Sequence, residues 1–182
     1  MDDTYIDKVL AGDTEAFRYF LRKYQDMAFN VAVSIVKDDH YAEEVVQDAF
    51  MKAFNGLKSF RRSARFKSWF YRIVVNESFQ RLKKIKRNAT LLTIDEVSER
   101  ENESPLTEPE QAQRIKEALK LLLPKESLAL VLFYLEEHSL KEVVIITGWS
   151  MANTKVILHR ARKNLRAILE KSLNDNQGNH GA

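Results

Sequence analysis

Apolar side chains recur every three or four residues along most of this chain, and that spacing constrains its fold more than any other feature. From residue 5 to residue 87 the pattern predicts consecutive helices, for example in the run Phe17, Phe20, Leu21 and Tyr24. The 182 residues include only five glycines and three prolines, so few positions can break such helices. We therefore predict an all-α protein.

The helical spacing stops between residues 88 and 108. This stretch contains Ser104-Pro105 and Glu108-Pro109, and residues 88–110 carry seven acidic side chains against the single base Arg100. Such a composition is typical of a flexible linker. We expect two small helical domains, residues 1–87 and 109–172, joined by a flexible acidic linker over residues 88–108. The polar residues 173–182 are expected to form a disordered tail.

Basic side chains concentrate on either side of the acidic linker. Residues 58–87 carry eleven lysines and arginines against Glu77 alone, and residues 150–172 carry six against Glu170. The net charge of the whole chain is only +3, so the clustering is more informative than the sum. Two cationic blocks of this kind indicate two modules that bind a polyanion such as nucleic acid.

The second domain contains a helix-turn-helix pattern. Ser139 can cap a short helix, Gly148 suits a tight turn because it tolerates positive φ, and Ser150 can cap a longer basic helix. In that helix Asn153 is suited to reading adenine, and Lys155 to phosphate or guanine. Four further side chains would follow the DNA backbone: His159, Arg160, Arg162 and Lys163. Any amphipathic hairpin with a basic surface shows the same pattern, so that interpretation stays open.

Aromatic and basic residues alternate in the first domain between residues 60 and 87. Basic side chains guide a phosphate backbone, and aromatic rings stack on unpaired bases at about 1–3 kcal/mol per base. The combination favours binding to separated DNA strands. The alternative is that the rings are ordinary core, which is the simpler reading for Phe70 and part of Trp69. The rings are Phe60, Phe66, Trp69, Phe70, Tyr71 and Phe79.

Several classes of site are missing from the sequence. The chain has no cysteine, its four histidines are scattered, and it has neither a glycine-rich phosphate loop nor a nucleophile elbow. We therefore expect no enzyme activity, no metal and no other cofactor. The longest apolar run, residues 128–135, is too short to cross a bilayer, and the N-terminus lacks a secretory pattern. A cytoplasmic protein without membrane insertion is expected.

Three stretches resemble the extracytoplasmic-function (ECF) group of bacterial RNA polymerase sigma factors. Residues 41–54, YAEEVVQDAFMKAF, are similar to the helix with which the family docks on core polymerase. Residues 60–76, FRRSARFKSWFYRIVVN, resemble its segment for melting the minus-ten promoter element. Residues 153–162, NTKVILHRAR, resemble its recognition helix for the minus-thirty-five element. With the acidic linker, the likeness covers roughly residues 9 to 172.

The resemblance implies a role for each group of residues. Glu44, Gln47, Asp48 and Met51 lie at three- and four-residue steps and would form the polymerase-binding face of one helix. The residues implied in minus-ten DNA binding are Phe60, Arg61, Arg62, Phe66, Lys67, Trp69, Tyr71, Arg72 and Asn76. Those implied in minus-thirty-five DNA binding are Ser150, Asn153, Thr154, Lys155, His159, Arg160, Arg162 and Lys163.

The sequence also departs from the family pattern. Val75, Glu77, Gln80 and Ile157 stand where the family usually has other residue types, and Arg61-Arg62 replaces a more usual Arg-Gly. These departures leave the promoter sequence open.

We therefore predict a sigma factor that binds core RNA polymerase, reads duplex promoter DNA and captures the melted non-template strand. The likeness also implies an anti-sigma factor as a protein inhibitor. Two alternatives remain. A stand-alone helix-turn-helix regulator would bind duplex DNA tightly without polymerase. A helical protein-interaction module without DNA binding would tolerate charge reversal in both basic regions.

Overall fold

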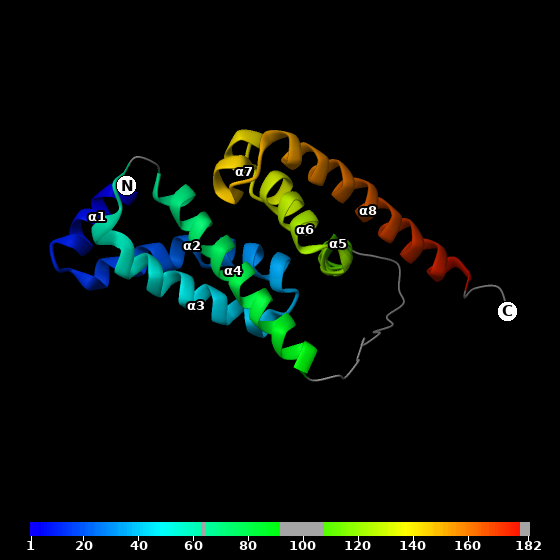
Figure 1. Cartoon of the computed structure of the whole chain (residues 1–182), viewed down its shortest axis with the longest axis horizontal. Helices are drawn as coiled ribbons and strands as arrows, with labels where there is room; N and C mark the ends of the chain where they lie inside the picture. The colour runs from blue at the N-terminus through cyan, green and yellow to red at the C-terminus, as the bar shows by residue number, and fades with distance from the viewer. Residues whose placement is uncertain (63–64, 92–107, 179–182) are drawn as a thin grey trace.

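The computed structural model describes residues 1–62, 65–91 and 108–178, and all of its regular elements in these ranges are helical (Figure 1). The predicted all-α fold is confirmed. Elements of the N-terminal part are α1 (Asp2–Leu10), α2 (Arg18–Val36), α3 (Asp39–Gly56) and α4 (Phe66–Leu91), with short 3-10 turns at Thr14–Phe17 and Leu57–Ser59. Those of the C-terminal part are α5 (Glu108–Leu121), α6 (Pro124–Leu130), α7 (Leu140–Thr147) and α8 (Met151–Gly178).

Helices α2, α3 and α4 pack against one another around a core of aliphatic and aromatic side chains. Their ends follow from local chemistry. Asp13 accepts a hydrogen bond from the amide of Ala16, and Asp38 accepts one from the amide of Tyr41 at 2.8 Å, so each carboxylate satisfies a free N–H at a helix start. Helix α2 ends where Lys37 adopts a left-handed conformation with φ of 66°.

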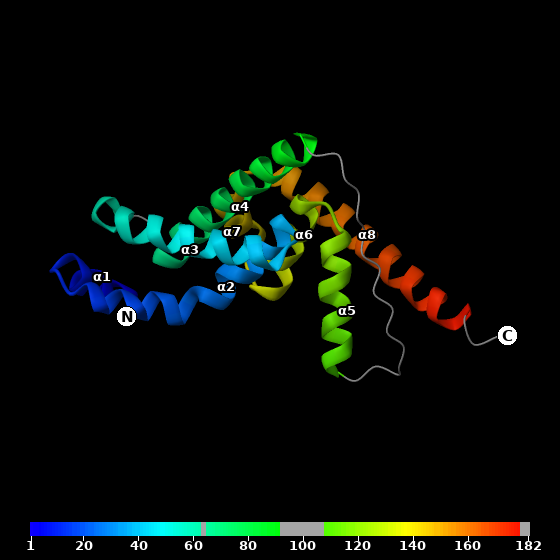
Figure 2. The ribbon, with the colours of Figure 1, turned by 90° about the horizontal axis from the view of Figure 1, so that it is seen from below.

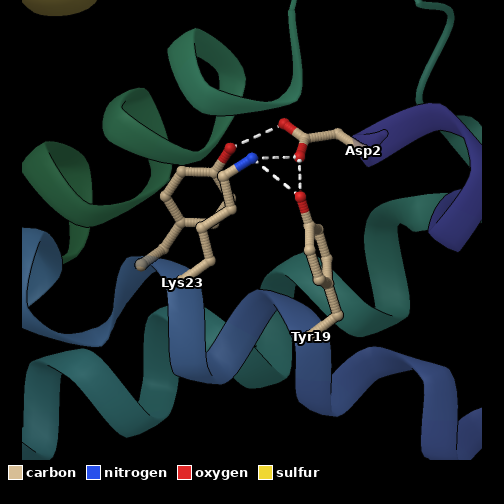
Figure 3. Close-up of polar contacts among 4 residues, drawn as sticks. Asp2, Tyr19 and Lys23 are labelled. Atoms are coloured by element: carbon tan, nitrogen blue, oxygen red, sulfur yellow. Dashed lines mark hydrogen bonds and ion pairs between the residues drawn. The ribbon is translucent and has the colours of Figure 1, made fainter.

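One carboxylate of α1 links this helix to α2 through three hydrogen bonds (Figure 3). Asp2 accepts hydrogen bonds from the Tyr19 hydroxyl at 2.8 Å, the Lys23 ammonium at 2.5 Å and the Tyr24 hydroxyl at 2.6 Å. Burial opposes the charge on Asp2, but these donors outweigh it and lower the pKa of the carboxyl. The ring of Tyr5 stacks on that of Tyr19, with centroids 3.9 Å apart. The N-terminal helix is therefore an integral part of the domain.

The two glycines that the sequence places at helix ends have different functions. Gly148 ends α7 with φ of 73°, as predicted. Gly56 is the last residue of α3, and its φ of −80° shows that the helix ends there without a left-handed residue. Its missing side chain matters for packing instead, because a Cβ there would lie 3.2 Å from the Trp69 ring.

Gly148→Ala is expected to lower the free energy of unfolding by about 1 kcal/mol, because alanine must adopt positive φ there. Among the described residues, no atom outside Gly148 and its two chain neighbours lies within 4 Å of the added Cβ, so a steric clash contributes nothing. Gly148→Asn should lose less, since asparagine tolerates this backbone region. Urea unfolding of the three proteins tests this. An alanine variant as stable as the wild type would contradict it.

The C-terminal part begins with α5, which Figure 2 shows projecting from the rest of the molecule. Pro124 occupies the first turn of α6, where a proline needs no amide partner. The sequence predicts one regular helix from residue 127 to residue 137, but α6 passes at Val131–Leu135 into a π turn, closed by the amide of Glu136 on the carbonyl of Val131 at 2.9 Å. A small apolar core of Leu122, Ala129, Leu130, Leu158 and Ala161 lies under α8.

The predicted domain ends differ from the observed helices. Helix α4 continues to Leu91 and so includes the first four residues of the predicted linker, while residues 92–107 lie outside the described residues. Helix α8 continues to Gly178, six residues beyond the predicted end of the second domain at 172. Backbone hydrogen bonding extends a helix through polar residues that periodicity alone marks as unstructured.

The N-terminal and C-terminal parts share one hydrophobic core. Helix α6 packs on α2, and α7 packs on α4 (Figures 1 and 2). Leu128, Leu132 and Val143 belong to the same buried cluster as Phe20 and Val74. At the edge of this contact the Lys37 ammonium donates to the carbonyl of Leu119 at 2.6 Å, and burial lowers the pKa of Lys37 to about 8 against the opposing charge of Glu126. The two domains therefore pack against each other, and we call this packed arrangement the closed form.

Candidate nucleic-acid interface

Helices α7 and α8 form the helix-turn-helix that the sequence predicts. Ser139 and Glu142 make a reciprocal capping box at the start of α7, and Ser150 accepts a hydrogen bond from the amide of Asn153 at 3.2 Å at the start of α8. Val143 and Ile146 of α7 are buried. The turn at Gly148 then fixes the direction in which α8 leaves α7. The capping predictions at Ser139 and Ser150 are confirmed.

One face of α8 is buried and the opposite face is open. Thr154, Leu158 and Ala161 point into the protein, and the Thr154 hydroxyl donates to the carbonyl of Ser150 at 2.9 Å. The sequence predicts that Thr154 contacts DNA, but only 1% of it is exposed, so its role is structural. The other predicted residues are exposed: Ser150, Asn153, Lys155, His159, Arg160, Arg162 and Lys163. The exposed side chains include four lysines and arginines.

Sequence reasoning missed two small apolar residues on this open face. Ala152 and Val156 are exposed and lie one helical turn apart, between the polar positions. Spacing from the buried residues Thr154 and Leu158 is the signal that would have placed them there.

The second cationic surface lies at the start of α4 and in the turn before it. Arg61, Arg62, Lys67, Arg72 and Asn76 are all exposed, as their predicted roles require. Arg62 has φ of 54° and forms an ion pair with Asp7 of α1. Ser63 and Ala64, which belong to the predicted base-capture loop, lie outside the described residues.

Two rings remain accessible beside these charges. Phe60 and Trp69 are half-buried, with centroids 4.8 Å apart and ring planes 33° apart. The Trp69 ring lies next to Gly56, where a Cβ would crowd it. Accessible rings next to exposed arginines match the surface that the sequence predicts for unpaired bases.

Two other predicted DNA-binding rings are buried. Phe66 is 2% exposed and lies among aromatic neighbours, with its ring centroid 4.2 Å from that of Phe20 and 5.6 Å from that of Tyr24. Tyr71 has no exposed surface. The direct DNA contacts predicted for Phe66 and Tyr71 do not occur in this arrangement, because a bundle this small needs large rings to fill its interior.

Tyr71 is covered by the second domain. Its hydroxyl donates to Glu136 at 2.6 Å, and its ring meets that of His138 edge-on at 4.6 Å. The Lys67 ammonium lies 5.7 Å from the same ring. Burial, reinforced by the charge of Glu136, raises the pKa of Tyr71, so the phenol is a neutral donor. Local sequence gives no signal for a contact between residues 65 positions apart.

Acidification is expected to weaken the contact between Tyr71 of α4 and the second domain. Burial and the charge of Lys67 lower the pKa of His138 below the usual histidine range, against Glu142 and Glu136, which raise it. Because the pKa of His138 is lower in the closed form, the closed form binds fewer protons than the opened form. The closed form therefore has its full stability above the usual histidine range, and it loses stability as pH falls through the lowered pKa of His138. The difference in unfolding free energy between wild type and His138→Gln should shrink as pH falls, and a constant difference would contradict this.

Three of the four α3 residues that the sequence predicts for polymerase binding are exposed. Val45, Ala49 and Ala53 are buried, which turns Gln47, Asp48 and Met51 outward. The Met51 side chain is 62% exposed. Glu44 is less available, because Arg81 of α4 pairs with it at 2.6 Å and also lies 3.8 Å from Asp48.

Within the described ranges, no group of three or more histidine and acidic side chains is placed to hold a metal ion. None of the helices there combines the length and apolar character that a bilayer crossing requires.

Two family models match separate parts of the chain. Residues 20–88 match sigma-70 region 2, and residues 112–165 match sigma-70 region 4. The chain is 30% identical over 141 residues to the RNA polymerase sigma factor YlaC of Bacillus subtilis, covering 72% of this chain and 79% of the relative. It is 29% identical over 154 residues to the ECF RNA polymerase sigma factor SigM of the same species, covering 84% and 94%.

Solved structures show the same fold. The sigma factor RpoE of Bartonella quintana, solved in complex with the anti-sigma factor NepR, is 24% identical with a TM-score of 0.68, and the match covers 85% of this chain and 96% of that one. CnrH, solved with the cytosolic domain of CnrY, is 22% identical with a TM-score of 0.67, covering 92% and 96%. Two region matches in order, relatives along most of the chain and a shared fold give one answer: the chain belongs to the ECF group of RNA polymerase sigma factors.

Proposed function

We propose that α8 of this sigma factor reads duplex DNA, that the start of α4 captures the melted strand, and that α3 binds core polymerase. The observation that carries the proposal is the open face of α8. Its N-terminus is fixed by the Ser150 cap, and Asn153, Lys155 and Arg160 project from it. A recognition helix enters the major groove with its N-terminal residues toward the base edges. Asn153 is suited to adenine, and Arg160 to phosphate or guanine.

Strand capture is proposed for the surface around Phe60 and Trp69. These rings offer π faces to unpaired bases, while Arg61, Lys67 and Arg72 neutralise the phosphate backbone. Phe66 supports the rings from within the core, with its centroid 5.6 Å from that of Trp69. The acid that pairs with Arg62 is Asp7, which is itself exposed.

Polymerase binding is proposed for Gln47, Asp48 and Met51 of α3. An acidic and apolar face repels the phosphate backbone and suits a protein partner. Arg81 fixes the Glu44 carboxylate beside this face and limits its movement.

The closed arrangement is proposed as the resting form of the chain. Tyr71 lies in the helix that faces melted DNA, and the second domain covers it. Separation of the domains would expose this side of α4 and let α8 reach a distant duplex element. RpoE of Bartonella quintana was solved with the anti-sigma factor NepR, and CnrH with the cytosolic domain of CnrY, and we propose an anti-sigma factor as a partner for this chain. We further propose that it acts in the cytoplasm, without catalytic activity of its own.

Transcription in vitro with core polymerase tests this assignment. Lys155→Glu/Arg160→Glu should reduce initiation at a promoter with an upstream element at least 100-fold, because it removes two cations and adds two anions at the phosphate backbone. Binding to core polymerase should not change. The matched control Lys116→Glu/Lys125→Glu, on α5 and α6, makes the same charge change at exposed positions. Equal loss in both variants would contradict the assignment to α8.

A stand-alone regulator and a protein-interaction module make different predictions for this assay. The first requires specific binding of the isolated chain to duplex DNA, and the second requires unaltered activity in the charge-reversed variant. Membership of the sigma factor family disfavours both.

A further inference from the structure

The centre of the open face of α8 is apolar. Val156 is 47% exposed, although the buried core of the domain lies on the other side of the same helix. Ala152 is exposed one turn before it. In the part of the chain that the structure describes, Val156 belongs to neither of the two apolar clusters.

Helical spacing places Val156 opposite the core. Thr154 and Leu158, two residues before and after it, are buried, so Val156 points outward between them. Asn153 lies three residues before it and Arg160 four residues after it, on the same face. Val156 therefore occupies the middle of the surface that carries the polar recognition groups.

Valine at this position has a local disadvantage. Its branched side chain loses rotamer freedom in a helix, and its exposed apolar surface gains nothing from water. A polar straight-chain residue would suit a plain solvated position better. A suitable partner has an apolar group that contacts Val156 and negative charges around it that pair with Lys155 and Arg160.

We infer that Val156 is a specificity-determining residue that contacts the 5-methyl group of a thymine in the upstream promoter element. In the major groove this methyl is the only apolar group that a base pair presents, and valine and alanine have no means of reading donors or acceptors. Ala152 leaves space for the backbone of α8 to approach the same base pair. This inference rests on the proposed role of α8 in duplex reading.

The experiment uses holoenzyme formed from the full chain and core polymerase. A duplex library randomised over the upstream element gives the preferred sequence, and each thymine of that sequence is then replaced by 2′-deoxyuridine, which removes only the methyl group. We expect one such substitution to weaken binding about three- to five-fold, the effect of losing one buried methyl contact. In Val156→Ala the same substitution should have little effect. Ile115→Ala on α5, also exposed, is the matched control and should respond like the wild type.

The outcomes separate this inference from the proposed function. Absence of any preferred upstream sequence would overturn both. A preferred sequence without an A·T pair, or one in which every deoxyuridine substitution is neutral, would overturn only the role of Val156. A methyl effect that persists unchanged in Val156→Ala would do the same. A methyl effect that Val156→Ala abolishes and Ile115→Ala preserves supports the inference.

Discussion

Phe66→Ala is expected to lower the free energy of unfolding by about 3–5 kcal/mol, the range for truncating a fully buried phenylalanine. Phe66 is 2% exposed, and its ring meets those of Phe20, Tyr24 and Phe70. The variant loses these contacts and leaves a cavity at the base of α4. Chemical unfolding monitored by circular dichroism gives the value.

Phe60→Ala is the matched control for Phe66→Ala, because both are phenylalanines of the same aromatic cluster and their centroids lie 6.2 Å apart. Phe60 is half-buried, so its replacement should destabilise the protein much less. In the proposed function Phe60→Ala should instead impair promoter melting. Equal stability of the Phe66 variant and the wild type would mean that Phe66 is not a core residue.

Tyr71→Phe is expected to shift the closed form toward the opened form by roughly 1.5–3 kcal/mol, the range for a hydrogen bond to a charged group. The hydroxyl of Tyr71 is the donor to Glu136 at 2.6 Å, so its loss leaves that carboxylate without this donor at the contact between α4 and the second domain. The chain has no cysteine, so two introduced cysteines can carry a fluorophore pair, one on α3 and one on α8. Energy transfer between them should fall.

Tyr24→Phe is the matched control for this experiment. It also removes a tyrosine donor to a carboxylate, Asp2, at 2.6 Å, but within the N-terminal domain. It should lower overall stability without changing the energy transfer. If Tyr71→Phe leaves the transfer unchanged as well, the hydroxyl does not contribute to closure. Greater promoter binding by the Tyr71 variant would connect closure with activity.

Local chemistry in the sequence predicts much of this structure. The caps at Ser139 and Ser150 and the positive φ of Gly148 depend on residues three or four positions apart, which a linear pattern contains. The outward face of α3 follows equally from spacing, since Val45 marks its buried side.

Contacts between distant segments explain what the sequence does not predict. Phe66 and Tyr71 stand among basic residues, so alternation alone suggests an accessible surface. Phe66 is buried by contact with α2, and Tyr71 is buried by Glu136 and His138 of the C-terminal domain. Thr154 is polar yet faces inward, because a hydrogen bond to its own helix satisfies its hydroxyl. The burial of Phe66 and Tyr71 requires the tertiary fold, because helical periodicity does not identify the neighbouring element.

Site-specific photo-crosslinking in the promoter complex tests the division between the two surfaces most directly. Probes would replace Arg61, at the start of the α4 surface, and Arg160, on the open face of α8. We expect the probe at 61 to mark the melted non-template strand of the minus-ten element, and the probe at 160 to mark duplex DNA at the minus-thirty-five element. Labelling of the same DNA segment by both probes, or of duplex DNA alone by the probe at 61, would contradict it.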